Sequence, residues 1–363
     1  MAYRIPLSYN PIDVDSFANV LKSYEGLHHN QIVTDFENAI ADLTGMPHAV
    51  AVSSGTAAIH LALLSLGIGK GDVVLAPTFT YVATINPILY AGAQPVLIDS
   101  ENETWNMDPM LLEQAIKSLR QKGIDPKAII IVHTYGMPAK MSEILAIAKK
   151  EGIPIIEDAA ESLGARYDGK MTGTMGEVGI YSFNNNKAVT TYGGGVLITR
   201  NPQVAEKARH YASQAREDLP FYEHKDVGFN YLMSPLNAAM GLSQLPMLEQ
   251  KNSARVQAFQ LYSESLKDKA AYQCDTEIRY SNRWLSTILL RDNSTKELIF
   301  NELKEAGIET RPLWKPMHLQ PLYQNVDKYL NGTSKDYFNR GLALPSVFEN
   351  PQQQEEVIQL LSQ

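Results

Sequence analysis

The sequence predicts an α/β protein in which helices flank a mostly parallel sheet and a smaller α+β unit follows. Within roughly the first 200 residues, short aliphatic runs recur without alternation of polar and apolar residues, which is typical of strands buried on both faces. Helical patterns separate these runs, and such alternation indicates βαβ units. After about residue 245 the pattern changes to a long polar helix with an apolar stripe. We therefore expect two domains, residues 1–245 and residues 246–363.

Each expected element has its own signal in the sequence. Strands are predicted over residues 48–54, 72–77, 95–100, 128–136, 153–160, 180–183 and 195–200. Helices are predicted over residues 56–67, 108–123 and 141–152, and the last two end at a glycine after a lysine-containing turn, a common C-terminal signal. The second domain should contain a helix over 247–269, a strand over 283–292 and a helix over 295–308. A final helix should begin with Asn350 as N-cap, Pro351 in the first position and Gln353 in a capping box.

The composition limits the class of protein. The chain has 363 residues, 44% of them hydrophobic, and 40 acidic against 32 basic side chains give a net charge of −8. This hydrophobic fraction supports a folded core. An acidic chain without a basic run is a poor candidate for binding nucleic acid.

The single cysteine and the N-terminal sequence bear on the compartment. Cys274 cannot form an internal disulfide or a thiolate zinc site, and we expect it to be a semi-buried bystander rather than a nucleophile. One cysteine is compatible with a reducing compartment. The first residues lack the pattern of a signal peptide. We expect a cytoplasmic protein and predict no metal site.

One stretch imitates a membrane span. Residues 73–98 contain no charged side chain and are long enough to cross a bilayer. Pro77, Pro87 and Pro95 interrupt the stretch, and prolines break a helix of that length. We expect a strand, a loop, a short helix and a strand instead, in a soluble protein that does not bind membranes.

Two motifs carry candidate binding chemistry. At residues 53–60 (SSGTAAIH) a strand ends in a Ser-Gly-Thr turn that opens a helix. The free N–H groups of such a helix start can hold an anion, although the same turn often serves only as an N-cap. Glu157 and Asp158 end an apolar strand, and only one of two adjacent side chains faces a ligand at the strand end. The alternative for this pair is an N-cap for the following segment.

Lys187 is the third candidate, and it changes the meaning of the other two. It follows three asparagines in a loop between two buried strands, ahead of three glycines at 193–195. A single loop lysine is usually only solvated. Pyridoxal 5′-phosphate (PLP), however, needs a Schiff-base lysine, an Asp beside its ring nitrogen and a phosphate anchor. The Asp keeps the ring nitrogen protonated, and the lysine becomes the base that moves the proton.

Four segments together resemble the DegT/DnrJ/EryC1/StrS family. They are SSGTAAIHLAL, IEDAAESLGARYDGKMTGTMGEVGIYSF, NNNKAVTTYGGGVLIT and VGFNYLMSPLNAAMGLSQL. The members of this family are fold type I PLP enzymes, and most of them transaminate nucleotide-linked keto sugars. The resemblance extends over about residues 36–345 and implies a fold type I aminotransferase.

The resemblance implies roles for the matching residues. Lys187 would form the Schiff base with PLP, and Asp158 would pair with the pyridine nitrogen. Tyr81 matches an aromatic residue that stacks on the cofactor ring, with a core tyrosine as the alternative. Glu161 stands where many members have glutamine near the 3′-oxygen, and an ionised carboxylate there would repel the cofactor phenolate. The residues implied at the cofactor phosphate are Gly55, Thr56, Ala57 and Ser182.

A homodimer with shared active sites is also implied. Asn230 matches a residue that reaches the cofactor phosphate of the neighbouring subunit. Where many members have an arginine two positions later, this chain has Leu232. A sister group of sugar dehydratases has histidine in place of the lysine, so Lys187 favours an aminotransferase.

Two segments indicate the substrate. SFNNNKAVTTYGGG and ETRPLWKPMH (residues 309–318) are most similar to the subgroup acting on UDP-4-keto-6-deoxy-N-acetylhexosamines. In the second segment Arg311 is expected at the diphosphate or the donor carboxylate. Trp314 is expected to cover the sugar or base, and His318 to bond the sugar or a phosphate. The alternative is a polar loop that covers the interface.

We therefore expect transfer of an amino group from glutamate to C4 of such a UDP-linked keto sugar in glycan biosynthesis. One alternative is a GDP- or dTDP-keto-sugar aminotransferase that acts at C3 or C4. Another is a non-catalytic PLP-fold regulatory protein. His133, which ends a predicted strand, is expected to be a structural histidine with satisfied hydrogen bonds.

Overall fold

The larger part of the molecule is built on a mostly parallel sheet, as predicted. The computed structural model describes residues 3–27 and 30–362, and within these residues the main sheet has eight strands. The six strands β8, β5, β4, β2, β3 and β13 run parallel to one another, whereas β9 is antiparallel to both β1 and β8. The spatial order is β1 (His48–Val52), β9 (Gly195–Thr199), β8 (Val178–Ser182), β5 (Ile155–Asp158), β4 (Ala128–Val132), β2 (Val73–Pro77), β3 (Gln94–Ile98) and β13 (Lys328–Tyr329).

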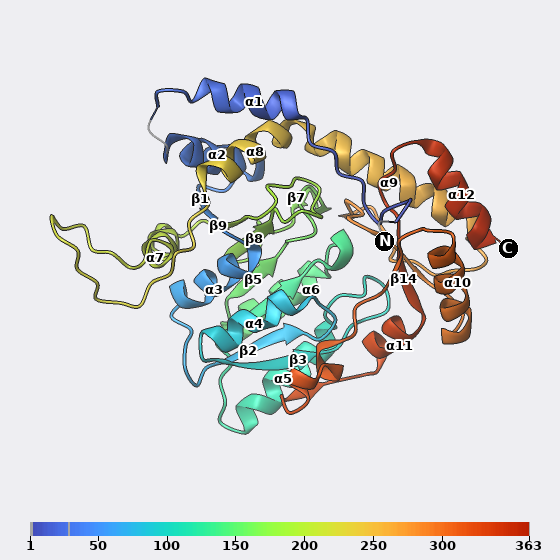
Figure 1. Cartoon of the computed structure of the whole chain (residues 1–363). Helices are drawn as coiled ribbons and strands as arrows, with labels where there is room; N and C mark the ends of the chain where they lie inside the picture. Colours follow the sequence, from blue (N-terminus) through green and yellow to red (C-terminus); the bar gives the residue numbers. More distant parts are fainter. Residues whose placement is uncertain (1–2, 28–29, 363) are drawn as a thin grey trace.

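Helices cover both faces of this sheet (Figure 1). Val74 and Ala76 of β2 belong to the core that contains α3 (Gly55–Ser65), α4 (Val82–Tyr90) and α7 (Pro202–Ala212). Val73 and Leu75 of the same strand belong to the core of α5 (Pro109–Gln121) and α6 (Met141–Glu151) on the other face. The helices α2 (Asn30–Thr44) and α8 (Pro235–Gln244) cover β1 and β9, and α1 (Val14–Ser23) packs beside them. Both faces are apolar, which explains why the strands appear as aliphatic runs.

Local sequence signals place the helix ends. Asp108 caps α5 by accepting the Met110 N–H at 2.8 Å, and α6 ends at Gly152, whose φ of 69° lies in the left-handed region. At the start of α12 (Pro351–Ser362), Asn350 accepts the Gln353 N–H at 3.2 Å as predicted. The Gln353 side chain accepts the N–H of Glu349 rather than that of the N-cap itself.

The uncharged stretch over residues 73–98 forms β2, α4 and β3, in the order expected from its prolines. Pro87 lies inside α4, which is nine residues long. Among the described residues, no helix is long and apolar enough to cross a membrane.

The C-terminal unit is attached through α9 (Leu248–Ser265), which runs from the large sheet to the far end of the molecule (Figure 1). Its antiparallel sheet has the order β11 (Ser286–Leu289), β14 (Gly341–Leu344) and β12 (Arg311–Pro312). Tyr262, Ile288, Leu303 and Val357 are buried in its core. The remaining elements of this unit are α10 (Asn293–Glu305), α11 (Thr333–Arg340) and the short helices η2 (Leu245–Met247), η3 (Met317–Leu319) and η4 (Pro321–Tyr323).

Two segments cross between the units. Ile5, near the N-terminus, pairs with Ile308 and lies in the core of the C-terminal unit. Conversely, β13 adds to the edge of the main sheet beside β3. We propose that the boundary between the two domains lies near residues 245 and 246. Ile5 and β13 are then the two places where one domain contributes to the core or sheet of the other.

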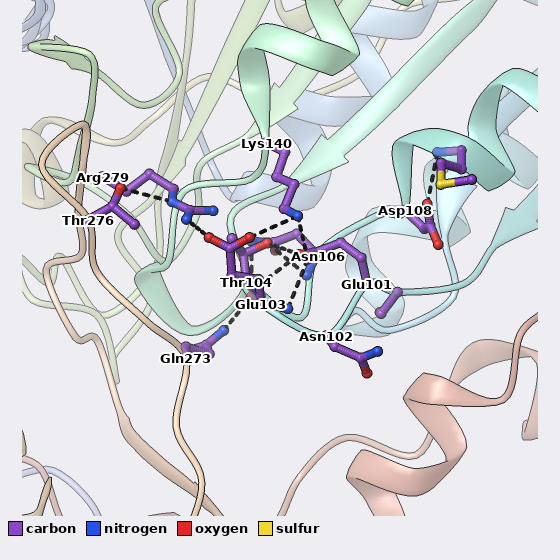
Figure 2. Close-up of polar contacts among 12 residues, drawn as sticks. Glu101, Asn102, Glu103, Thr104, Asn106, Asp108, Lys140, Gln273, Thr276 and Arg279 are labelled. Carbon is purple, nitrogen blue, oxygen red and sulfur yellow. Dashed lines mark hydrogen bonds and ion pairs between the residues drawn. The ribbon is translucent and has the colours of Figure 1, made fainter.

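A polar network ties the segment 273–279 to the large unit (Figure 2). Lys140 Nζ lies 3.1 Å from Glu101 Oε2 and 2.9 Å from Glu103 Oε2. Arg279, in β10 (Arg279–Tyr280), pairs with Glu103, and the Gln273 amide donates to the Thr104 carbonyl at 2.8 Å. The strand β10 also pairs with β6 (Arg166–Tyr167), which pairs with β7 (Lys170–Met171).

Cys274 lies in this segment and is exposed, so the prediction of a semi-buried thiol is wrong. The preceding side chain, that of Gln273, is buried against the large unit. In an extended segment, adjacent side chains point in opposite directions. Cys274 therefore faces solvent.

Candidate active site

A cavity of about 390 Å³ lies at the carboxyl ends of the strands β5 and β8, beside the start of α3. This is the edge at which open parallel sheets bind ligands. The cavity brings the three predicted motifs together. It is lined by Ser54, Gly55, Thr56, Ile59, Thr80, Tyr81, Ala83, Thr84, Val132, Asp158, Ala160, Glu161, Ser182, Asn184, Asn186, Lys187, Gly193, Gly194, Trp284 and Trp314.

One end of the cavity is the N-terminus of α3. Ser54 is the N-cap, and its Oγ accepts the Ala57 N–H at 3.0 Å. The N–H groups of Gly55 and Thr56 have no carbonyl partner within the helix, because they belong to its first turn. The Ser182 side chain is in close contact, since a Cβ added to Gly55 would lie 3.1 Å from Ser182 Cβ. This end therefore presents backbone donors, a hydroxyl and the positive end of a helix dipole to an anion.

Asp158 lies at the end of β5 and is buried. Its Oδ2 accepts the Thr84 hydroxyl at 2.7 Å, and its Oδ1 accepts the Ala160 N–H at 3.2 Å. Burial raises the pKa of Asp158, and the two hydrogen bonds and the charge of Lys187 act in the opposite direction. A cationic ligand group beside this carboxylate would favour its ionised form.

The adjacent Glu157 points away from the cavity, as the alternation of side chains along a strand predicts. Its carboxylate accepts the backbone N–H groups of Gly173 at 2.8 Å and Met175 at 2.5 Å. His133 Nε2 lies 3.0 Å from Glu157 Oε2, and His133 Nδ1 accepts the Ala139 N–H at 3.1 Å. Because its Nδ1 is an acceptor, His133 donates from Nε2, and the prediction of a satisfied structural histidine is confirmed.

Lys187 extends from its loop into the cavity, where two groups face its ammonium. Glu161 Oε1 lies 3.4 Å from Nζ, and the centroid of the Trp284 ring lies 4.1 Å from it. Trp284 also donates its indole N–H to the Asn186 carbonyl at 2.9 Å. The indole therefore holds the loop and lies over the lysine that the loop presents.

The Glu161 carboxylate accepts a hydrogen bond from a residue whose backbone conformation is unusual. Its Oε2 accepts the Tyr135 N–H at 2.8 Å, and Tyr135, in η1 (Thr134–Gly136), has a φ of 56°. Residues other than glycine rarely adopt this conformation, and functional sites are among the places where it is found. Burial raises the pKa of Glu161 to about 7, although Lys187 acts against the shift.

The opposite wall of the cavity is aromatic. Tyr81, 58% exposed, is the N-cap of α4 and accepts no N–H bond from that helix with its side chain, so the alternative of a core tyrosine does not hold. Its ring centroid lies 6.4 Å from that of Trp314. Trp314 stacks on Tyr135 with centroids 4.4 Å apart, and the backbone N–H of Trp314 donates to the Tyr135 hydroxyl at 3.1 Å.

Four predicted residues lie outside the lining of this cavity: Ala57, whose N–H is bonded to Ser54 Oγ, and Arg311, His318 and Asn230. Arg311, with 59% of its side chain exposed, pairs with Glu309 at 2.6 Å. His318 Nδ1 lies 2.8 Å from the Thr78 hydroxyl, and burial lowers the pKa of His318. Asn230 is exposed and pairs with Ser213, directly after α7. The segment between these two residues projects from the rest of the molecule (Figure 1).

Sequence reasoning missed Thr84, Tyr135 and Trp284. Trp284 appeared only as part of a predicted strand, yet it precedes β11 and reaches the lysine loop across the boundary between the units. No local pattern signals such a tertiary contact. For Tyr135, its place directly after a strand end is the one available signal.

Comparison with known proteins identifies the family. The model of the DegT/DnrJ/EryC1/StrS aminotransferase family matches residues 11–362. The chain belongs to this family. It is 46% identical over 321 residues to EpsN of Bacillus subtilis, by name a pyridoxal phosphate-dependent aminotransferase, with 87% of this chain and 83% of the relative covered. It is 36% identical to the GDP-perosamine synthase of Escherichia coli O157:H7, over 86% of this chain and 84% of that enzyme.

Solved structures of the family have the same fold. A DegT DnrJ EryC1 StrS aminotransferase from Brucella abortus superimposes with a TM-score of 0.90 at 30% identity, over 96% of this chain and 95% of that chain. DesV of S. venezuelae superimposes with a TM-score of 0.88 at 26% identity, over 100% and 98% of the two chains. The chain is therefore a PLP-dependent sugar aminotransferase of fold type I.

The residues present in the cavity fit PLP. A helix N-terminus with an adjacent hydroxyl suits its phosphate, the buried Asp158 suits its ring nitrogen, and Lys187 suits its aldehyde. The three partners come from the start of α3, the end of β5 and the loop after β8. One rigid sheet edge thus positions all of them.

Proposed function

We propose that this sugar aminotransferase transfers an amino group from glutamate to C4 of a UDP-linked 4-keto-6-deoxy-N-acetylhexosamine, for glycan biosynthesis in the cytoplasm. The observation that carries the catalytic assignment is the convergence of Lys187, Asp158 and the N-terminus of α3 on one cavity. The choice of a UDP-linked acceptor is supported by the segments 182–195 and 309–318, which are most similar to that subgroup.

In this proposal the cofactor is held at three points. The N–H groups of Gly55, Thr56 and Ala57 and the hydroxyl of Ser182 bind the phosphate, and the Ala57 N–H is shared with Ser54 Oγ. Thr84 and Ala160 donate hydrogen bonds to the Asp158 carboxylate, and a protonated ring nitrogen beside it would favour the ionised form against the effect of burial. When bound, PLP supplies an electron sink for the carbanion that forms at Cα of the amino donor.

Lys187 is the proposed base. Its Nζ takes the proton from Cα of the donor and returns a proton to the cofactor side, and for this it must be a neutral amine when it acts. Glu161 Oε1, 3.4 Å from Nζ, is placed to accept the proton that Lys187 has to lose.

Glu161 suits this role because its carboxyl can hold a proton near neutral pH, given a pKa of about 7. A protonated Glu161 also does not repel the cofactor's phenolate, which resolves the conflict expected for an ionised carboxylate at this position. The Tyr135 N–H keeps the carboxyl oriented in either protonation state.

On the substrate side, Tyr81 is proposed to stack on the cofactor ring and Trp314 to cover the sugar or base. Arg311 and His318 belong to the same segment as Trp314 but do not line the cavity. We propose that they contact the outer part of the nucleotide sugar. For Arg311 this requires release from Glu309.

We further propose a homodimer in which Asn230 of one subunit reaches the cofactor phosphate of the other. Asn230 is exposed and does not line the cavity of its own chain. The projecting segment that ends near it exposes Phe221 at 60%, Tyr222 at 79% and Val227 at 82%. Large apolar side chains at such exposure are typical of a surface that a partner covers.

A GDP-linked keto sugar is the second candidate acceptor. It is supported by the GDP-perosamine synthases of three bacteria, which are 32–36% identical to this chain. A non-catalytic role is disfavoured because Lys187 and Asp158 are both present and both line the cavity.

The acceptor is tested by supplying the holoenzyme and glutamate with a matched panel of UDP-, dTDP- and GDP-linked 4-keto sugars and by NMR of the products. We expect a 4-amino sugar from the UDP-linked N-acetylhexosamine, with kcat/KM at least tenfold above that of the other nucleotides. A preference for the GDP-linked sugar would replace the proposed acceptor. Absence of amine from every sugar would contradict the function itself.

A further inference from the structure

Two cations on one face of α9 lie beside the N-terminal segment and do not line the active-site cavity. Lys251 and Arg255 are four residues apart, so their side chains are neighbours on the helix surface. Arg255 is only 1% exposed. Its Nη1 donates to the Lys251 carbonyl at 2.9 Å and its Nη2 to Asn10 Oδ1 at 2.7 Å, whereas its Nε has no hydrogen-bond partner in the described part of the chain.

The positive charges of this pair are not matched by a carboxylate. Lys251 Nζ donates to Gln244 Oε1 at 2.8 Å. Within residues 3–27 and 30–362, every hydrogen bond of the two side chains therefore ends on a neutral oxygen. Burial lowers the pKa of Arg255 to about 10, and burial together with the charge of Arg255 lowers that of Lys251 to about 8. Charged groups are normally buried only when they are paired.

A second cavity of about 390 Å³ opens beside these cations. Residues 9–13 form one wall, α9 forms another, and Val347 and Phe348 form a third. Asp13 is the acidic residue of the lining, and its carboxylate already accepts the Ser16 N–H at 2.9 Å as the N-cap of α1. With two cations and one engaged carboxylate, the lining has an excess of positive charge in a chain whose net charge is −8.

We propose that this cavity, which we name the α9 anion site, binds a small oxyanion of the carboxylate or phosphate type at Lys251 Nζ, with the buried guanidinium of Arg255 beside it. The oxyanion would accept from Lys251 Nζ and supply the missing counter-charge to both cations. The guanidinium is held in place from behind by Asn10 and by the Lys251 carbonyl. Its positive charge is therefore fixed beside the cavity.

The α9 anion site is connected to the lysine loop of the active site. Gln244 Oε1, which accepts from Lys251, also faces the Thr190 N–H at 3.5 Å, and Gln244 Nε2 donates to the Thr190 carbonyl at 2.5 Å. Thr190 lies three residues after Lys187 in the same loop. An anion that draws Lys251 away from Gln244 would therefore change how firmly this loop is held.

The binding test uses the PLP-loaded enzyme, so that the cofactor phosphate site is filled. Thermal unfolding is measured against inorganic phosphate and, separately, against malonate, with chloride keeping the ionic strength constant. We expect a saturable rise in Tm with at least one of the two anions. A response to phosphate alone assigns the phosphate class, and a response to malonate alone assigns the carboxylate class.

Matched variants locate the effect. Lys251→Gln removes one cation at a half-buried position and should raise the anion's dissociation constant, fitted from the rise in Tm, at least tenfold. Lys304→Gln, at an exposed lysine in the last turn of α10, should leave it unchanged. A rise in Tm that never saturates, or one that Lys251→Gln retains in full, would overturn the proposed site.

The coupling to the lysine loop has its own readout. The rate at which the holoenzyme loses PLP on dilution, followed by cofactor absorbance, should change at least twofold at saturating anion in the wild-type enzyme. It should not change in Lys251→Gln. An anion that binds with no effect on this rate would overturn the coupling. Because these measurements involve no sugar substrate, they are independent of the acceptor proposed above.

Discussion

The two sides of the active-site cavity are held in different ways. On the cofactor side, the start of α3, Asp158 and the lysine loop are attached to a sheet that is buried on both faces. On the substrate side, Trp314 belongs to the segment 311–318, which lies outside the main sheet. Trp314 stacks on Tyr135 and the Met317 N–H donates to the Thr78 carbonyl at 2.7 Å, whereas Arg311 is largely exposed. A rigid frame suits the chemistry that a family shares, and a connecting segment outside that frame suits the recognition of different sugars.

The sharpest way to test the cofactor side compares two adjacent carboxylates. Asp158→Asn should lower kcat by roughly 10²–10³-fold, because the amide no longer stabilises a positive ring nitrogen. Glu157→Gln should leave kcat within about threefold but lower the free energy of unfolding by about 3 kcal/mol, because buried N–H groups lose a charged acceptor. Steady-state kinetics and urea unfolding of both variants measure the two effects. Equal losses of kcat in the two variants would contradict the assignment of a catalytic role to Asp158 and a structural role to Glu157.

On the substrate side, Trp314→Ala should raise KM for the nucleotide sugar about tenfold and change kcat less, since about 1.4 kcal/mol of stacking and contact is lost. Trp314→Phe, which keeps an aromatic face on Tyr135, should recover most of the affinity. PLP content, measured by absorbance, serves as the control and should remain at the wild-type level in both variants. Loss of PLP from Trp314→Ala would place this residue on the cofactor side instead.

A smaller effect concerns Glu161 and pH. Its pKa in the folded protein, about 7, is above its ordinary value of 4.5 because of burial. The associated stability is therefore present at low pH and is lost as pH rises from about 4.5 to 7, by up to about 3 kcal/mol. Urea unfolding of the cofactor-free enzyme should show this decrease, and Glu161→Gln should reduce it. Burial raises the pKa of Asp158 in the same direction, so only the difference between the two proteins reports Glu161. Identical pH profiles would exclude a proton on Glu161.

The elements were predictable where local chemistry determines them. The aliphatic runs of β2 to β5 and the Asp108 cap follow from burial and from hydrogen bonding within a few residues. The same holds for the orientation of Asp158 into the cavity, which depends only on alternation along a strand. The antiparallel direction of β9 and the entry of β13 into the main sheet depend on contacts distant in sequence, and no local pattern encodes them.

The residues of the candidate site also fall into a group that the sequence predicts and a group that it does not. Lys187 and the start of α3 follow from a motif order that one cofactor explains. Trp284 reaches the lysine from the other unit, and Tyr135 adopts a left-handed backbone that only tertiary contacts stabilise. Both contacts require the assembled fold.

The most direct test of the central claim is to locate the cofactor on the chain. The PLP-loaded enzyme is reduced with borohydride, which makes the bond between lysine and cofactor permanent, and is then digested and analysed by mass spectrometry. We predict one phosphopyridoxyl group per chain, on the peptide that contains Lys187, and none on that peptide in Lys187→Ala. A cofactor attached to a different lysine, or no covalent cofactor after reduction of an active preparation, would contradict the account.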